Sequence, residues 1–242
     1  MHALVLRSLH VALLLMFAGC VAGCSSSDEK ESEPQGAPGE VRIVPAAGAD
    51  VPYQLAPNSY GITGGAFLAR ANLGSSSVVL EPAAEGKICL KGTVEMVPTP
   101  ADGSHPPYSD YWGVELGFNL NQAASNDETT QTKQPWNVPS NVTGFWFTLE
   151  GDMIPSMRFK ATPTGKDPAL EQDSCALVSP TNGARTEVPF SDMYVQCWNG
   201  PQGTGTTDTS QGLLDIGLQI AAATNAEYPL DFCLTHIGVV EK

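Results

Sequence analysis

Residues 111–122 alternate strictly between apolar side chains and polar or small ones. On one side lie Trp112, Val114, Leu116, Phe118 and Leu120, and on the other lie Gly113, Glu115, Gly117, Asn119 and Asn121. Side chains of a β-strand point to opposite faces in turn, whereas a helix would not separate these residues. Burying one Trp or Phe removes about 150 to 250 Å² from water, which stabilises a fold by at most about 4 to 6 kcal/mol. The segment therefore predicts a central strand with one face in the core and the other against polar groups.

From residue 41 onward the chain consists of short apolar runs separated by Gly, Pro, Asn and Asp, which is typical of an all-β sandwich or barrel. Residues 211–223 could compete as a helix because they hold few β-branched residues. Alternation of Leu214, Ile216, Leu218 and Ile220 with Asp215, Gly217 and Gln219 still favours a strand. Long loops are expected at residues 98–107 and 122–139. The expected strands are residues 65–71, 77–80, 87–97, 111–121, 143–150, 156–162, 174–178, 186–190, 213–221 and 230–240.

Residues 1–23 are typical of a cleaved export signal. Arg7 precedes an apolar run over residues 11–18, far shorter than the roughly 18 residues that cross a bilayer. Residues 21–23 before Cys24 resemble the bacterial lipobox, in which the cysteine is acylated and becomes the new N-terminus. Cys20 is the weaker alternative, because bulky Phe17 stands where the motif has Leu, Val or Ile. We expect lipidation with palmitate at Cys24, and two or three acyl chains make a stable membrane anchor.

Residues 24–45 are expected to form the lipidated cysteine and a flexible acidic tether, and residues 46–242 the folded β-sandwich. No Asp follows Cys24 directly, which in many Gram-negative bacteria favours sorting to the outer membrane. The chain has a net charge of −14. Such an acidic surface argues against nucleic acid as a partner and against direct adsorption to anionic lipid.

The four remaining cysteines allow three pairings. Cys175 and Cys197 lie in neighbouring runs, while Cys89 and Cys233 lie in the first and last long strands. This placement favours disulfides between Cys175 and Cys197 and between Cys89 and Cys233, the second of which would join the two sheets. A zinc site is disfavoured because there is no pair of cysteines two residues apart.

Several of these segments together resemble a galactose-binding-like jelly roll. They are residues 111–121, 142–151 and 157–160, the spacing from Cys175 to Cys197 and Trp198, and residues 231–240. The likeness extends from about residue 60 to the C-terminus, and it is to exported, lipidated Gram-negative proteins and to noncatalytic carbohydrate-binding modules of this fold. It implies a jelly-roll β-sandwich of two antiparallel sheets. Many such domains hold a structural calcium ion with acids near the end of the chain. Thr235 and His236 stand in place of those acids, which argues against that ion, and no cofactor is expected.

Catalytic patterns are absent from the sequence. There is no His-Glu-x-x-His, no Gly-x-Ser-x-Gly and no phosphate-binding loop, and residues 171–176 lack the final acid of the Glu-x-Asp-x-x-Glu pattern of jelly-roll glycosidases. Two carboxylates on one strand face could still cooperate in glycoside hydrolysis. Catalysis is nevertheless the weaker interpretation, and no catalytic residue is assigned.

The polar sides of the strands suggest carbohydrate binding. If these strands share one sheet, aromatic planes lie among acids, amides and a guanidinium, and such a surface suits the C–H faces and hydroxyls of sugars. An outward face that is polar only for solubility is the alternative for each residue. Trp136, in a loop, is a further candidate for an exposed platform. The candidate binding residues are Trp146, Arg158, Glu115, Asn119, Tyr194, Gln196, Asp215, Gln219 and Trp136.

Together these features predict an envelope-anchored lipoprotein that binds a glycan or polysaccharide without cleaving it. A structural or protein-interaction lipoprotein with no small ligand is the alternative, and a glycoside hydrolase is less favoured. The partners expected are a glycan and, through the lipid anchor, a membrane.

Overall fold

The computed structural model divides the chain into two units, residues 1–35 and 36–242, and all described residues belong to the second. They are residues 36–45, 53–75, 77–81, 86–102, 104, 107–122, 133–152, 154, 156–165, 173–195, 197 and 207–242. The expected signal, Cys24 and its alternative Cys20 lie outside the described residues, as do Gln196 and Trp198. In this part of the chain, no helix is long and apolar enough to cross a membrane.

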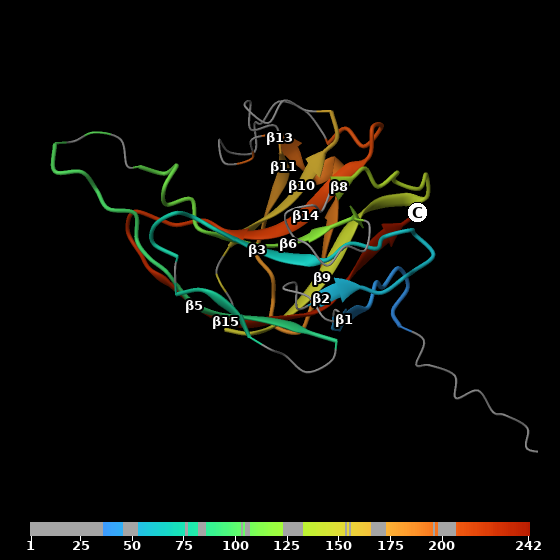
Figure 1. The fold of residues 1–242 in the computed structure, drawn as a ribbon, viewed down its shortest axis with the longest axis horizontal. Coiled ribbons are helices and arrows are strands. Elements are labelled where there is room, and N and C mark those ends of the chain that lie inside the picture. Colours follow the sequence, from blue (N-terminus) through green and yellow to red (C-terminus); the bar gives the residue numbers. More distant parts are fainter. Residues whose placement is uncertain are drawn as a thin grey trace, which may run out of the picture. The chain divides into compact units, whose positions relative to one another are not determined.

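Two antiparallel sheets form a β-sandwich, which confirms the predicted fold class (Figure 1). The six-stranded sheet has the order β13 (Tyr194–Val195), β11 (Ser174–Val178), β10 (Met157–Pro163), β14 (Leu213–Ile220), β6 (Val114–Asn119) and β3 (Ala66–Arg70). The five-stranded sheet has the order β12 (Arg185–Pro189), β9 (Val142–Gly151), β15 (Tyr228–Glu241), β5 (Ile88–Val94) and β4 (Val79–Glu81). Two small pairs are β1 (Ile43–Pro45) with β2 (Tyr53–Leu55) and β7 (Asn121–Gln122) with β8 (Lys133–Gln134), and a short 3₁₀ helix, η2, spans Phe190–Asp192.

The strand order is that of a jelly roll. Eight strands, β5, β6, β9, β10, β11, β12, β14 and β15, follow one another along the chain in this order. Numbered one to eight, they stand in the order 1-8-3-6 in one sheet and 2-7-4-5 in the other. This interleaving is how two Greek keys fold into a double-sheet sandwich.

The core lies between the sheets and is built from the apolar half of each alternation. Val114, Leu116 and Phe118 of β6 are buried there, and Phe147 of β9 stacks on Phe159 of β10 with ring centroids 5.8 Å apart. The expected strand over residues 111–121 is shorter than predicted. Gly113, with φ of 106°, precedes β6, and the chain leaves the sheet at Leu120 to form β7 in another pair.

The folded unit begins ten residues earlier than the sequence predicts. Val41 is buried, its N–H donates to Ile237 O at 2.8 Å, and Val239 N–H donates to Gly39 O at 2.8 Å. Residues 39–41 therefore continue the five-stranded sheet beside β15, past the start of β5 at Ile88. The expected boundary between residues 45 and 46 is wrong, because the polar composition of this segment hides its backbone pairing.

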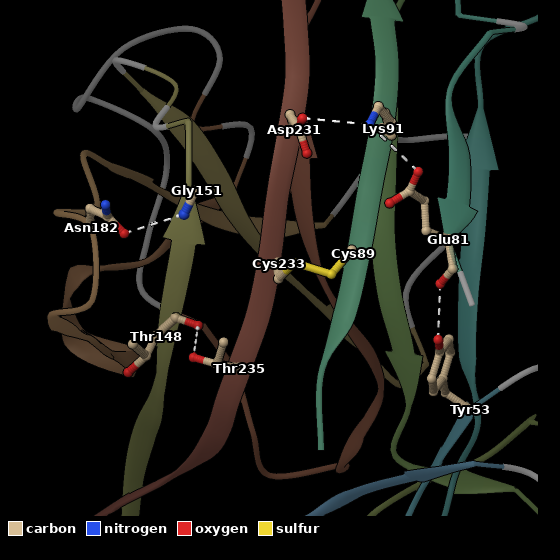
Figure 2. The surroundings of a disulfide bond; sticks show 10 residues. All are labelled: Tyr53, Glu81, Cys89, Lys91, Thr148, Gly151, Asn182, Asp231, Cys233 and Thr235. Atoms are coloured by element: carbon tan, nitrogen blue, oxygen red, sulfur yellow. Dashed lines mark hydrogen bonds and ion pairs between the residues drawn. A yellow bond between two sulfur atoms is a disulfide. The ribbon is translucent and has the colours of Figure 1, made fainter. Parts of the chain in front are cut away.

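The two disulfides are Cys89–Cys233 and Cys175–Cys197, the pairings that the sequence favours. Cys89 and Cys233 stand directly opposite each other on β5 and β15, and both are half-buried on the outward face of the five-stranded sheet (Figure 2). The expectation that this bond joins the two sheets is wrong, because the first and last long strands are neighbours within one sheet.

Candidate functional site

The candidate site is the side of the six-stranded sheet that points away from the core, which we call the polar face. Residues directly opposite in an antiparallel pair project from the same side, so the strand register gives its layout. One row across the sheet consists of Tyr194, Cys175, Lys160, Gly217, Gly117 and Phe67. The next consists of Leu177, Arg158, Gln219, Glu115 and Ala69, and a third of Thr162, Asp215 and Asn119.

Six of the nine predicted residues are thus brought to one face. Glu115, Asn119, Arg158, Tyr194, Asp215 and Gln219 project from four strands that lie far apart in the sequence. In β6, β10 and β14, period-two alternation selects this side because the opposite side is apolar and fills the core.

Trp146 does not belong to this face, and that part of the prediction is wrong. It lies on β9, whose neighbours are β12 and β15 of the five-stranded sheet. The residue is 2% exposed, and the Arg185 guanidinium carbon lies 4.4 Å from the ring centroid. A ring covered in this way offers no surface to a sugar.

Trp136 is likewise no exposed platform. It is 3% exposed, its Nε1 donates to Tyr60 O at 2.7 Å, and its ring centroid lies 5.8 Å from that of Phe145. Its indole anchors the segment before β9 to the core. Gln196 lies outside the described residues, so its placement stays a prediction.

Lys160 joins two carboxylates at the centre of the polar face. Its Nζ lies 2.9 Å from Glu115 Oε2 and 2.9 Å from Asp173 Oδ2. Burial raises the pKa of the Glu115 carboxyl, and the Lys160 ammonium offsets only part of that rise. Burial alone would lower the pKa of Lys160, but the two carboxylates outweigh it and the net shift is upward. The ammonium is therefore firmly protonated.

Asp215 is held by two partners. Lys133 Nζ, from β8, lies 2.7 Å from Asp215 Oδ2, and Thr162 Oγ1 donates to Asp215 Oδ1 at 2.6 Å. The same Lys133 ammonium lies 5.0 Å from the centroid of the Phe67 ring. The far end of that ring rests on Gly117, where any larger residue would collide with it.

Asn119 has an unused acceptor. Its Nδ2 donates to Gln122 Oε1 at 2.7 Å, while its Oδ1 is buried without a hydrogen-bond partner, and the residue is 7% exposed. Buried polar atoms in native proteins nearly always have a partner. Asn119 Oδ1 is one of five buried side-chain atoms of the described residues that lack one, and Trp146 Nε1 on the other sheet is another. Asn119 lies directly opposite Asp215.

Sequence reasoning missed several members of this network: Phe67, Gln122, Lys133, Thr162 and Asp173. Phe67 has apolar neighbours on both sides, so alternation could not assign its face. Lys133 belongs to a two-residue strand, which is too short to show a periodic signal.

A depression of about 350 Å³ lies away from the polar face, on the other sheet beside the N-terminal segment. It is lined by residues 40–44, Gly86, Lys87, Thr235 and His236. Thr235 Oγ1 donates to Thr148 O at 3.3 Å, and exposed His236 has its Nδ1 3.0 Å from Thr235 Oγ1. Among the described residues, no group of three or more His, Cys, Asp or Glu side chains is placed to hold a metal ion.

Two solved structures are similar to this fold. The family 11 carbohydrate-binding module of the cellulosomal cellulase Lic26A-Cel5E of Clostridium thermocellum is 13% identical with a TM-score of 0.43, over 84% of this chain and 95% of that chain. The solution structure of CtCBM11 is 11% identical with a TM-score of 0.40, over 84% and 96%. A likeness of this degree carries no argument about function. No family model and no curated protein matches the chain.

Proposed function

We propose that the polar face binds carbohydrate without cleaving it. The observation that carries this proposal is the gathering of acids, amides and a guanidinium on one face of the sheet, where Asn119 Oδ1 is a buried acceptor without a hydrogen-bond partner. Around it stand a carboxylate, amides and a hydroxyl, and half-buried aromatic rings, Phe67 and Tyr194, lie on the two outer strands β3 and β13.

This chemistry suits a sugar better than an apolar ligand. Sugar hydroxyls donate to amide and carboxylate oxygens, and their C–H faces pack on aromatic rings. A hydroxyl that reaches Asn119 Oδ1 would supply its missing hydrogen bond, and leaving such a group unsatisfied costs about 1 to 3 kcal/mol.

Binding without cleavage is favoured because the carboxylates of this face are already engaged. Glycosidases need one carboxyl group that donates a proton and a second that activates water or attacks the sugar. Glu115 and Asp173 share the Lys160 ammonium, and Asp215 is held by Lys133 and Thr162.

The tethered location belongs to the same proposal. The chain is exported, acylated on Cys24 and held at the envelope, in the outer membrane of a Gram-negative bacterium, with its sandwich displayed for glycans. Metabolic labelling with palmitate tests the anchor: label should enter the wild-type chain and be absent from Cys24→Ala.

Affinity electrophoresis of the full chain through gels containing different soluble polysaccharides tests the binding. At least one polysaccharide should retard the wild type, and Asn119→Ala should reduce that retardation at least tenfold. Lys91→Gln is the matched control, because Lys91 is 55% exposed on the outward face of the five-stranded sheet (Figure 2). No retardation by any polysaccharide would contradict the proposal and favour a structural or protein-interaction role.

Cleavage is tested separately. Incubation with each retarding polysaccharide should release no reducing ends. Release that Glu115→Gln or Asp215→Asn abolishes would make the chain a glycoside hydrolase instead.

A further inference from the structure

The polar face carries three cations among the described residues, and two of them are neutralised. Lys160 lies 2.9 Å from each of two carboxylates, and Lys133 lies 2.7 Å from a third. Arg158 is different, since its NH1 donates only to the neutral Gln219 Oε1, at 3.3 Å. No carboxylate of the described residues lies within ion-pair distance of it.

Arg158 lacks a carboxylate partner in the described part of the chain although its side chain is partly removed from water. The side chain is half-buried, and burial lowers the pKa of its guanidinium, although a guanidinium stays protonated in proteins. The chain has 26 acidic and 12 basic residues. Arg158 is therefore unpaired even though acidic residues are plentiful. A partly desolvated charge is stabilised by an opposite charge with directed hydrogen bonds.

Arg158 has no acidic neighbour in the strand register. Its register neighbour on β11 is Leu177, which is 59% exposed, and its neighbour on β14 is Gln219. The Glu115 carboxylate reaches over Gly217 of β14 to the Lys160 ammonium, which already neutralises it. A ligand carboxylate at the guanidinium would therefore have Leu177 and Gln219 as its register neighbours, and the nearby Glu115 charge is offset by Lys160.

We propose that the ligand of the polar face is an acidic glycan, and that Arg158 binds the carboxylate of a uronic acid unit. This inference rests on the proposed carbohydrate binding and adds the substrate class. The planar fork of Arg matches a carboxylate with two parallel hydrogen bonds, whereas Lys offers only a point charge. Asn119 Oδ1 then accepts a hydrogen bond from a sugar hydroxyl. The two residues thus bind different groups of the same glycan.

The test compares uronate polymers with forms whose carboxylate is blocked. The full chain is run through gels containing polygalacturonate or alginate, and through gels containing the methyl ester of each polymer. At least one acidic polymer should retard the wild type at least tenfold more strongly than its ester, and 0.5 M salt should weaken this retardation. Arg158→Gln should remove the difference between acid and ester.

Two further variants keep the result interpretable. Arg158→Lys keeps the charge and should retain part of the preference for the acidic polymer over its ester. Lys91→Gln removes the same charge as Arg158→Gln but on the other sheet, so it should retain the whole preference. Equal retardation by acid and ester, or a preference unchanged in Arg158→Gln, would overturn the inference. Binding of a neutral glycan that Asn119→Ala weakens and Arg158→Gln leaves intact would overturn it while the proposed function stands. Failure of every polysaccharide to bind would overturn both.

Discussion

Replacing Lys160 by Met should destabilise the fold strongly, because it leaves the most buried carboxylate of the polar face without a cation. Lys160 Nζ lies 2.9 Å from one oxygen of Glu115 and from one of Asp173. At an effective dielectric constant of about 20, each contact supplies roughly 6 kcal/mol of attraction before desolvation is subtracted. Breaking a buried pair by removing one partner costs about 3 to 5 kcal/mol. Asp173 is partly exposed and can rehydrate, so we expect a loss of about 3 to 4 kcal/mol at pH 7, most of it from Glu115.

Glu115→Gln should be much milder, at about 1 kcal/mol, because Lys160 keeps its contact with Asp173. Adding Glu115→Gln to Lys160→Met should restore about 2 kcal/mol, since no buried charge then remains unpaired at Glu115. The assay is equilibrium unfolding in urea of the four members of this double-mutant cycle at pH 7. A double variant no more stable than Lys160→Met would refute the reasoning.

The pH dependence supplies a second readout of the same network. The folded pKa of Glu115 is raised above its usual value of 4.5, chiefly by burial. A raised pKa means that the contribution of this group is fully present below about pH 4.5 and is lost as the pH rises through the folded value. Without the Lys160 ammonium the pKa rises further, so the deficit of Lys160→Met should be smaller at pH 4.5 than at pH 7. If the stability lost in Lys160→Met did not depend on pH, the loss would come from another source, for instance from the packing of the lysine side-chain methylenes.

Other predictions concern the covalent and steric framework. Replacing Cys89 and Cys233 by Ser should lower the free energy of unfolding by about 5 kcal/mol, and replacing Cys175 and Cys197 by about 3, because the bonds span 144 and 22 residues. Guanidinium unfolding measures both, and equal losses would contradict the chain-entropy explanation. Gly238→Ala should cost about 1 to 3 kcal/mol, because its Cβ would collide with the backbone oxygen of Gly39 and would lie 2.5 Å from the buried indole of Trp146. A melting temperature unchanged by this substitution would contradict the close approach of both groups to residue 238.

Alternation predicted the long strands because each buries one side against the other sheet. Leu116 and Phe118 of β6 and Leu218 of β14 are buried as the pattern requires, and the polar side of both strands is common to one face. Short pairs such as β1 with β2 have too few residues to show a period, so they were missed.

Which sheet a strand joins is not encoded by its alternation. Trp146 was placed correctly on the side of β9 that points away from the core, but β9 pairs with β12 and β15 and not with β10. The Phe67 ring occupies the space left by Gly117, the residue directly opposite it on the neighbouring strand. The sequence of one strand does not show which residue will lie opposite it on another. Long-range register therefore decided which of the candidate residues share a surface.

The central claim is that carbohydrate binds on the outward side of the six-stranded sheet. It is tested most directly by NMR titration of the isotope-labelled full chain with the polysaccharide that retards it most. The account predicts that amide and side-chain signals of Phe67, Asn119, Arg158 and Gln219 shift in proportion to occupancy, while those of Lys91 and Trp146 on the other sheet stay in place. Shifts concentrated around Lys91 and Trp146, with the polar face unchanged, would contradict it.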